Sequence, residues 1–217
     1  MNDKQAALLK KYTPMSKGQL KAVVADYAAR FPKWVIFVDG TAFVRRSGPV
    51  RQMIWFQKMS SASYRPSHGI GSLVLPEAHI RMLPQVLDVK HREVEHRWHE
   101  RKFADTLAAM EQQFRPDIRK PLDIADVLAL CETEAASMPD RTNDMAMLAI
   151  LYAWLGRDTE ALDCCERMQH CPLPTLAPMP EWEEAMRAFG RELASAVSVG
   201  GGRRFIEAAI EKQQRAG

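Results

Sequence analysis

Three histidines and three glutamates fall within thirteen positions of the stretch KHREVEHRWHERK, residues 90–102. Imidazole and carboxylate groups serve as metal ligands and as general acids or bases, so this stretch holds the side chains for either chemistry. On a helix, His91, Glu95 and His99 would share one face at i, i+4 and i+8. His96 and Glu100 would form a second such pair. One hypothesis is therefore a metal-dependent hydrolase centred on residues 91–100.

The spacing of these residues differs from the known zinc motifs. Neither H-E-x-x-H nor H-x-x-E-H occurs, and the string from His91 to His96 is one residue too long. Charge pairs such as Glu93 with Arg97 stabilise a solvated helix by about 0.2–0.5 kcal/mol each, and Val94 with Trp98 would form its buried stripe. We expect a charged surface helix or a partner-binding surface here, with no catalytic residue, no metal site and no cofactor.

The elements around this stretch change character along the chain. Residues 3–12 and 16–31 have helical spacing, and Ser16 with Gln19 fits a capping box. The segments that follow are rich in β-branched and aromatic residues and are separated by Asp-Gly and Ser-Gly-Pro turn signals. They predict an antiparallel sheet of about four strands, at residues 33–40, 41–46, 50–59 and 68–76.

From about residue 77 onward the pattern is helical and no strand is expected. The helices are predicted at residues 77–88, 92–114, 122–137, 143–155, 158–170, 180–198 and 203–215. The predicted fold class is therefore α+β. Its N-terminal helices and roughly four-stranded antiparallel sheet occupy residues 1–120, and a helical region at 121–217 packs on them as a separate part or as one continuous domain.

Basic and aromatic side chains occur together on the predicted sheet. Strand alternation places Arg51 and Trp55 on one face of residues 50–58, and Gln52, Ile54 and Phe56 on the other. Single-strand nucleic-acid binders use such a combination, so nucleic-acid binding through the basic N-terminal half is a second hypothesis. The candidate partner-binding residues are Arg45, Arg46, Arg51, Trp55, Lys58 and Arg65.

Charge is distributed unevenly along the 217 residues. Residues 1–120 carry 21 Lys and Arg against 11 Asp and Glu, a net +10, and residues 121–217 carry 9 against 16, a net −7. The asymmetry suggests an acidic partner for the first half, or attraction between the halves. The first residues contain no apolar run of signal-peptide length, the later apolar runs are too short to span a membrane, and the four cysteines have no paired spacing. We expect buried free thiols in a cytoplasmic protein with no membrane partner.

Five positions in residues 143–172 follow a repeat pattern: Leu148, Tyr152, Gly156, Ala161 and Pro172. They fall where the tetratricopeptide repeat, which this segment resembles, places its leucine, aromatic, glycine, small residue and terminal proline. Cys165 stands where that repeat usually has a larger aromatic residue. The chain has no second copy at the repeat spacing, so the resemblance implies a helical hairpin packed on its neighbours.

A second resemblance rests on the predicted strands, at Phe43, Arg45, Gly48, Val50, Ile54, Gln57 and Lys58, and more loosely at Gly69, Ile70 and Gly71. These residues resemble the strand core of an uncharacterised bacterial domain family found beside polymorphic toxins as immunity-type proteins. The resemblance implies an α+β domain without active-site residues.

We therefore predict a non-catalytic binding protein, specifically an immunity protein that neutralises a cognate toxin by direct occlusion. Its contact surface would be the basic sheet with its rim, or the His/Glu stretch. Alternatively, the acidic C-terminal half would mimic nucleic acid and plug a basic nuclease cleft. Nucleic-acid binding and metal-dependent hydrolysis are the alternative functions.

Overall fold

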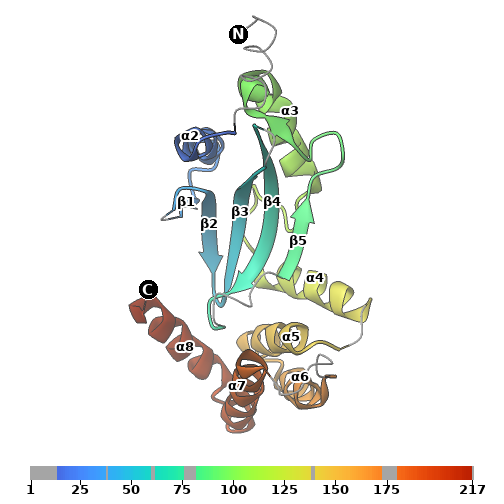
Figure 1. Ribbon diagram of the computed structural model, residues 1–217. Coiled ribbons are helices and arrows are strands. Elements are labelled where there is room, and N and C mark those ends of the chain that lie inside the picture. The colour runs from blue at the N-terminus through green and yellow to red at the C-terminus, as the bar shows by residue number, and fades with distance from the viewer. Residues whose placement is uncertain are drawn as a thin grey trace, which may run out of the picture. The chain divides into compact units, whose positions relative to one another are not determined.

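A computed structural model describes residues 14–37, 39–59, 62–75, 82–137, 140–172 and 180–216. The fold is mixed α+β, as predicted, with an antiparallel sheet and a helical C-terminal half (Figure 1). The helix predicted at residues 3–12 lies outside the described residues. Two compact units divide the chain: unit 1 is Met1–Arg45, Gln52–Gly69 and Pro84–Pro121, and unit 2 is Arg46–Arg51, Ile70–Leu83 and Leu122–Gly217.

The sheet has six strands within the described residues. They are β1 (Val35–Ile36), β2 (Ala42–Ser47), β3 (Val50–Lys58), β4 (Ser63–Ser72), β5 (Met82–Val86) and β6 (Val94–Glu95). Strands β1 to β5 lie in sequence order, and β6 pairs with β4. The predicted strand at 33–40 is thus much shorter than expected, and the one predicted at 68–76 begins earlier, at Ser63.

Two predicted helices are wrong in part. Residues 82–86 of the helix predicted at 77–88 form strand β5, where Pro84 would interrupt a helix. The helix predicted at 92–114 begins only at His99, because Val94 pairs with Tyr64 across β4 and β6. A 3-10 turn, η2 (His96–Trp98), joins this strand pair to the helix. Strand pairing between distant segments here overrides the local helical spacing.

The core of unit 1 is aromatic. Helices α2 (Lys17–Ala28) and α3 (His99–Gln113) pack on one face of the sheet, where Tyr27 stacks on Phe56 with ring centroids 5.1 Å apart. Helix α2 begins with the predicted capping box, in which Ser16 and Gln19 exchange side-chain and backbone hydrogen bonds. Along β3, the face that contains Gln52, Ile54 and Phe56 is the buried one.

Unit 2 surrounds one apolar helix. Helix α5 (Thr142–Trp154) is apolar on nearly all sides and contacts each of α4 (Ile124–Ala136), α6 (Asp158–His170), α7 (Glu181–Ser198) and α8 (Gly202–Ala216). These five helices match the predicted segments closely. All four cysteines are free and buried within the unit, as expected, and burial raises the pKa of the Cys131 thiol to about 12.

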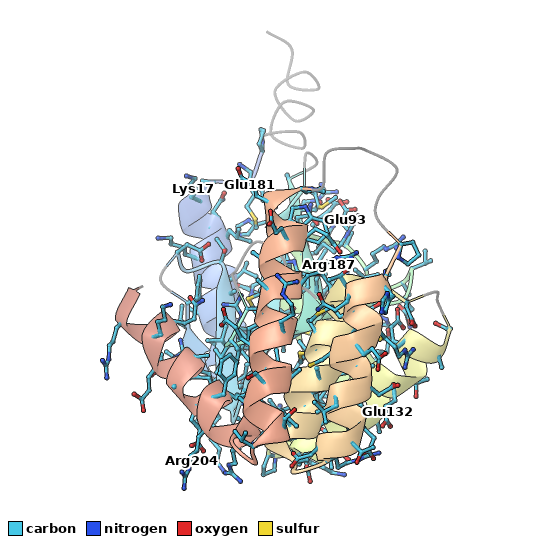
Figure 2. The ribbon with its side chains drawn as sticks, turned by 90° about the horizontal axis from the view of Figure 1, so that it is seen from below. Lys17, Glu93, Glu132, Glu181, Arg187 and Arg204 are labelled. Atoms are coloured by element: carbon cyan, nitrogen blue, oxygen red, sulfur yellow. The ribbon has the colours of Figure 1, made fainter. Side chains whose placement is uncertain are left out.

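Arg187 fastens α7 to the end of α6, and Figure 2 shows it near the N-terminal end of α7. Its guanidinium pairs with the buried Glu183 at 3.0 Å and donates to the carbonyl oxygen of Cys171 at 2.7 Å and to that of Gln169. The last carbonyl groups of α6 are thus satisfied by a side chain. No helix among the described residues is both long enough and apolar enough to cross a membrane.

Candidate functional site

The side chain of Arg45, a predicted partner-binding residue, is hydrogen-bonded within unit 1. Its Nε donates to Oε1 of Gln52 at 2.6 Å, its Nη2 donates to the carbonyl oxygen of Asp117 at 2.9 Å, and its Nη1 donates to that of Lys120. The guanidinium carbon lies 4.8 Å from the centroid of the Trp34 ring. Arg45 therefore holds the segment after α3 against β2. This is a structural role, and its predicted role in partner binding stays a prediction.

The same hydrogen-bond network fixes the protonation state of a fully buried histidine. Gln52 Nε2 donates to the carbonyl oxygen of Pro116 and to Nε2 of His68, both at 2.9 Å. Because an amide nitrogen only donates, His68 Nε2 must accept and the ring must be neutral. Burial, and secondarily the charge of Arg45, lower the pKa of His68 to about 3. This histidine is stacked on Phe114 and unavailable to a ligand.

The remaining predicted sheet residues are divided between the units. Trp55, Lys58 and Arg65 belong to unit 1, and Arg46 and Arg51 belong to unit 2. Lys58 and Arg46 are exposed, and Trp55 and Arg51 are half-buried. Arg65 lies 3.9 Å from Oε2 of Glu93, which also accepts a hydrogen bond from Ser63. Of the predicted cations in unit 1, Arg45 and Arg65 are half-buried and Lys58 is exposed.

The His/Glu stretch does not form the single helix that the metal hypothesis needs. His91 lies in a turn, 2.8 Å from Asp88, Glu95 lies on β6, His96 lies in η2, and His99 begins α3. Among the described residues, no group of three or more His, Cys, Asp and Glu side chains is placed to hold a metal ion. The helical i, i+4 arrangement predicted for these residues is wrong, because residues 94–95 join the sheet.

His99 instead belongs to a chain of hydrogen bonds that runs into the core of unit 1. Its Nε2 lies 3.1 Å from Oδ2 of Asp26, and its Nδ1 lies 2.7 Å from the hydroxyl of Tyr64, which is 3.2 Å from that of Tyr27. Asp26 is 60% exposed, whereas His99 is only 8% exposed and both tyrosines are buried. The chain thus leads from the surface inward.

This hydrogen-bond chain leaves no lone pair of His99 for a substrate. The Asp26 carboxylate accepts from Nε2–H, and Nδ1 is hydrogen-bonded to the Tyr64 hydroxyl, so both ring nitrogens are engaged. Burial, with smaller effects from Tyr27 and Asp26, raises the pKa of Tyr64 far above its usual value, so that hydroxyl is not a ready nucleophile either. The arrangement links α2, α3 and β4 and satisfies buried polar groups, which is a structural role.

The outward side of the same segment carries an exposed tryptophan. Trp98 is 42% exposed, although the sequence pattern predicted it in a buried stripe with Val94. The guanidinium carbons of Arg97 and Arg101 lie 5.2 and 5.7 Å from the Trp98 ring centroid, within cation–π range. We call Trp98, Arg97, Arg101 and the exposed Lys102 the Trp98 surface. It is the candidate interaction surface of unit 1.

A pocket of about 390 Å³ opens in unit 1 at the start of α3. It is lined by Asp26, Ala29, Arg30, His99, Glu100 and Phe103, and the Arg30 guanidinium carbon lies 5.5 Å from the centroid of the Phe103 ring. Its lining shares the first turn of α3 with the Trp98 surface. The pocket lining thus has both acidic and basic side chains, and both ring nitrogens of His99 are taken up by Asp26 and Tyr64.

Sequence reasoning named the stretch that contains this surface but assigned its most important residue to the interior. One signal could have located Trp98 outside. Arginines at positions 97 and 101 flank it at spacings that bring guanidinium groups over the indole on a turn or helix. No family model, curated protein or solved structure matches this chain. The resemblances to an immunity-type family and to a tetratricopeptide repeat remain predictions.

Proposed function

We propose that this chain is a non-catalytic binding protein that engages a protein partner through the Trp98 surface. The observation that carries the proposal is the partly exposed Trp98 ring, with two arginine guanidinium groups within cation–π distance of it. Tryptophan and arginine are the residues most enriched among energetic hot spots of protein interfaces. A ring already fixed by its neighbours loses little conformational entropy when a partner covers it.

In its specific form, the proposal is an immunity protein that neutralises a cognate bacterial toxin by covering it. The likeness of residues 41–76 to an immunity-type family supports this form. So does the occupation of both ring nitrogens of His99 and the burial of His68, because occlusion requires complementary shape and charge rather than a catalytic base. The sheet residues Lys58 and Trp55 are a secondary contact surface in this proposal.

Nucleic-acid binding is the second candidate function, and it is favoured by the excess of ten positive charges in residues 1–120. Exposed tryptophan with arginine also serves as a stacking platform for unpaired bases. The two functions differ in their salt dependence, since nucleic-acid binding weakens steeply as counterions compete. A protein interface with a packed apolar centre survives moderate salt.

A pulldown from the source organism's lysate, with and without nuclease, tests the proposal. The bait is the tagged wild-type chain, with Trp98→Ala as the test variant and Val199→Ala as the control. Val199 is an 82% exposed apolar residue of unit 2, so its truncation shows how much capture depends on non-specific binding to exposed apolar side chains. We expect one stoichiometric protein that persists after nuclease treatment with wild type and Val199→Ala, and is lost with Trp98→Ala.

The identity of the captured protein then tests the immunity form. Expression of that protein alone should harm the host cell, and co-expression of the wild-type chain should restore growth while Trp98→Ala should not. Recovery of nucleic acid alone, with everything lost after nuclease treatment, would move the function to the second candidate. Capture that is equal for wild type and Trp98→Ala would remove the Trp98 surface from the proposal.

A further inference from the structure

The geometry points to a partner that presents carboxylate side chains to the Trp98 surface, and we infer that the contacting face of the partner protein is acidic. This inference rests on the proposed function, because it names the chemistry of the partner at the same surface. It starts from Arg101, whose guanidinium lies against the Trp98 ring and makes no hydrogen bond or ion pair within the described residues.

The Arg101 guanidinium lies over the indole, with its carbon 5.7 Å from the ring centroid, within cation–π range. A planar guanidinium has its five N–H donors along its edges, and those of Arg101 have no acceptor within the described residues. Carboxylates match this fork in a bidentate geometry that gives strong, directional hydrogen bonds. Arg101 therefore offers a ready site for a glutamate or aspartate of the partner, directly beside the apolar surface of Trp98.

The acidic residues close to Arg101 in sequence form no ion pair with it within the described residues. Glu95 pairs with Arg97 at 2.6 Å, and Glu100 lines the pocket with Asp26 and Arg30. Asp105, four residues after Arg101, forms no ion pair with it within the described residues. Lys102 is exposed and adds a second cation next to Arg101. Arg101 and Lys102 are thus two cations of the Trp98 surface that form no ion pair within the described residues.

Long-range charge acts in the same direction. Residues 1–120 carry ten more basic than acidic side chains, so an acidic partner is drawn toward this part of the chain. Such steering raises association rates and falls as salt screens the charges. The contact combines this attraction with an aromatic anchor, so the affinity should decrease with salt without vanishing.

A protein face fits the surface better than a nucleic-acid strand. Among the described residues of unit 1, the exposed large apolar side chains are Val35, Ile36, Val86, Val89 and Trp98, of which one is aromatic. Single-strand binders stack successive bases on several aromatic rings along a groove. A single exposed tryptophan with arginine beside it does not form such a row of rings, and it matches the anchors enriched in protein interfaces.

The indole N–H resonance of Trp98 reports directly on this contact. The ¹⁵N-labelled chain has five tryptophans, and Trp98→Phe identifies the resonance. It is titrated with a short synthetic peptide of glutamate and aspartate, and separately with an oligothymidylate of equal charge. We expect the peptide to shift the Trp98 resonance, and Arg101→Gln to weaken that binding about tenfold. Arg101→Lys should recover only part of the affinity, because an ammonium group offers no planar fork.

Arg204→Gln is the matched control, because it removes one positive charge from an exposed arginine on α8 (Figure 2). This variant should bind the peptide like wild type. A Trp98 resonance that the peptide leaves unmoved, or that oligothymidylate shifts at lower concentration, would overturn the acidic partner. The pulldown with Trp98→Ala is independent of this titration, so the proposed function can stand when the inference fails, and its own failure is seen there.

Discussion

Two stretches of unit 1 contain similar residue types but present them in opposite ways. In β2 to β4, Arg45 and His68 are tied to Gln52 and to backbone carbonyl groups, with aromatic rings against both. In residues 96–102, Arg101 and Trp98 lie at the surface, and the arginine bonds to no other described group. Arginine beside an aromatic ring thus serves as an internal clamp in one stretch and as a contact surface in the other.

The contrast between Arg45 and Arg101 shows that residue type and spacing do not decide the role of an arginine beside an aromatic ring. What decides it is the number of acceptors within reach of the guanidinium. Arg45 faces three, two of them backbone carbonyl oxygens of the segment after α3. Arg101 faces none, so its donors are left to water or to a partner.

Arg45→Ala should lower the free energy of unfolding by about 3 kcal/mol, because it leaves three acceptors and the Trp34 ring without their partner. The matched control is Arg46→Ala, at the next position of the same strand, where the side chain is exposed. It should change the free energy by less than about 0.5 kcal/mol. Urea denaturation measures both. Equal effects for the two variants would show that Arg45 is not a clamp.

Acidification should destabilise the fold through His68. The folded pKa of about 3 lies below the ordinary value of 6.5, so the unfolded chain binds the proton more readily. The neutral histidine contributes its full stability above about pH 6.5, and this contribution is lost as the pH falls toward 3. The loss is about 2 kcal/mol at pH 5. His68→Phe should make the free energy of unfolding less dependent on pH between about 5 and 7.5. An unchanged pH slope would contradict the buried neutral ring.

Tyr64→Phe should lower the free energy of unfolding by about 1.5 kcal/mol. The substitution removes the hydroxyl that lies between Tyr27 and His99, which leaves Nδ1 of the buried His99 without a partner and takes one hydrogen bond from the Tyr27 hydroxyl. Asp26→Asn is the comparison at the other end of the chain. It should cost only about 0.5 kcal/mol, because that carboxylate is largely exposed. Thermal and urea denaturation give the two values, and the reverse order would mean that the chain is stabilised from its surface end.

Trp98→Ala should affect stability less than the Arg45, His68 and Tyr64 variants do, by about 0.5 kcal/mol, because much of the ring is already in contact with water. This small value contrasts with the large loss of binding that we propose for the same variant. Circular dichroism and a thermal melt suffice to measure it. A loss of several kcal/mol would indicate that Trp98 is a core residue, as the helical pattern had first suggested.

Much of the fold follows from local sequence signals. The Ser16 capping box, the Asp-Gly and Ser-Gly-Pro turns and the apolar helix at residues 142–154 each act within one element, and each was predicted. Strands β5 and β6 were missed. Val94 follows helical spacing in sequence, and only its pairing with Tyr64, thirty residues earlier, makes it a strand. Pairing energy between distant segments has no local signature.

The candidate site shows the same division between local and distant information. The stretch at residues 90–102 was predicted to be a charged surface helix or a partner-binding surface, because charge density is visible in sequence, and its partner-binding role stays a prediction. The face of each residue was not, since it depends on β6 turning the chain before α3 begins. Arg45 was taken for a surface cation because its acceptors, Asp117 and Lys120, lie more than seventy positions away.

The most direct test of the central claim is the dissociation constant of the captured partner for wild type and for Trp98→Ala, measured by calorimetry on purified proteins. We expect the dissociation constant to be at least about 30-fold larger for Trp98→Ala than for wild type, with a nearly unchanged melting temperature. An equal dissociation constant for the two chains, at equal stability, would show that the partner does not bind the Trp98 surface.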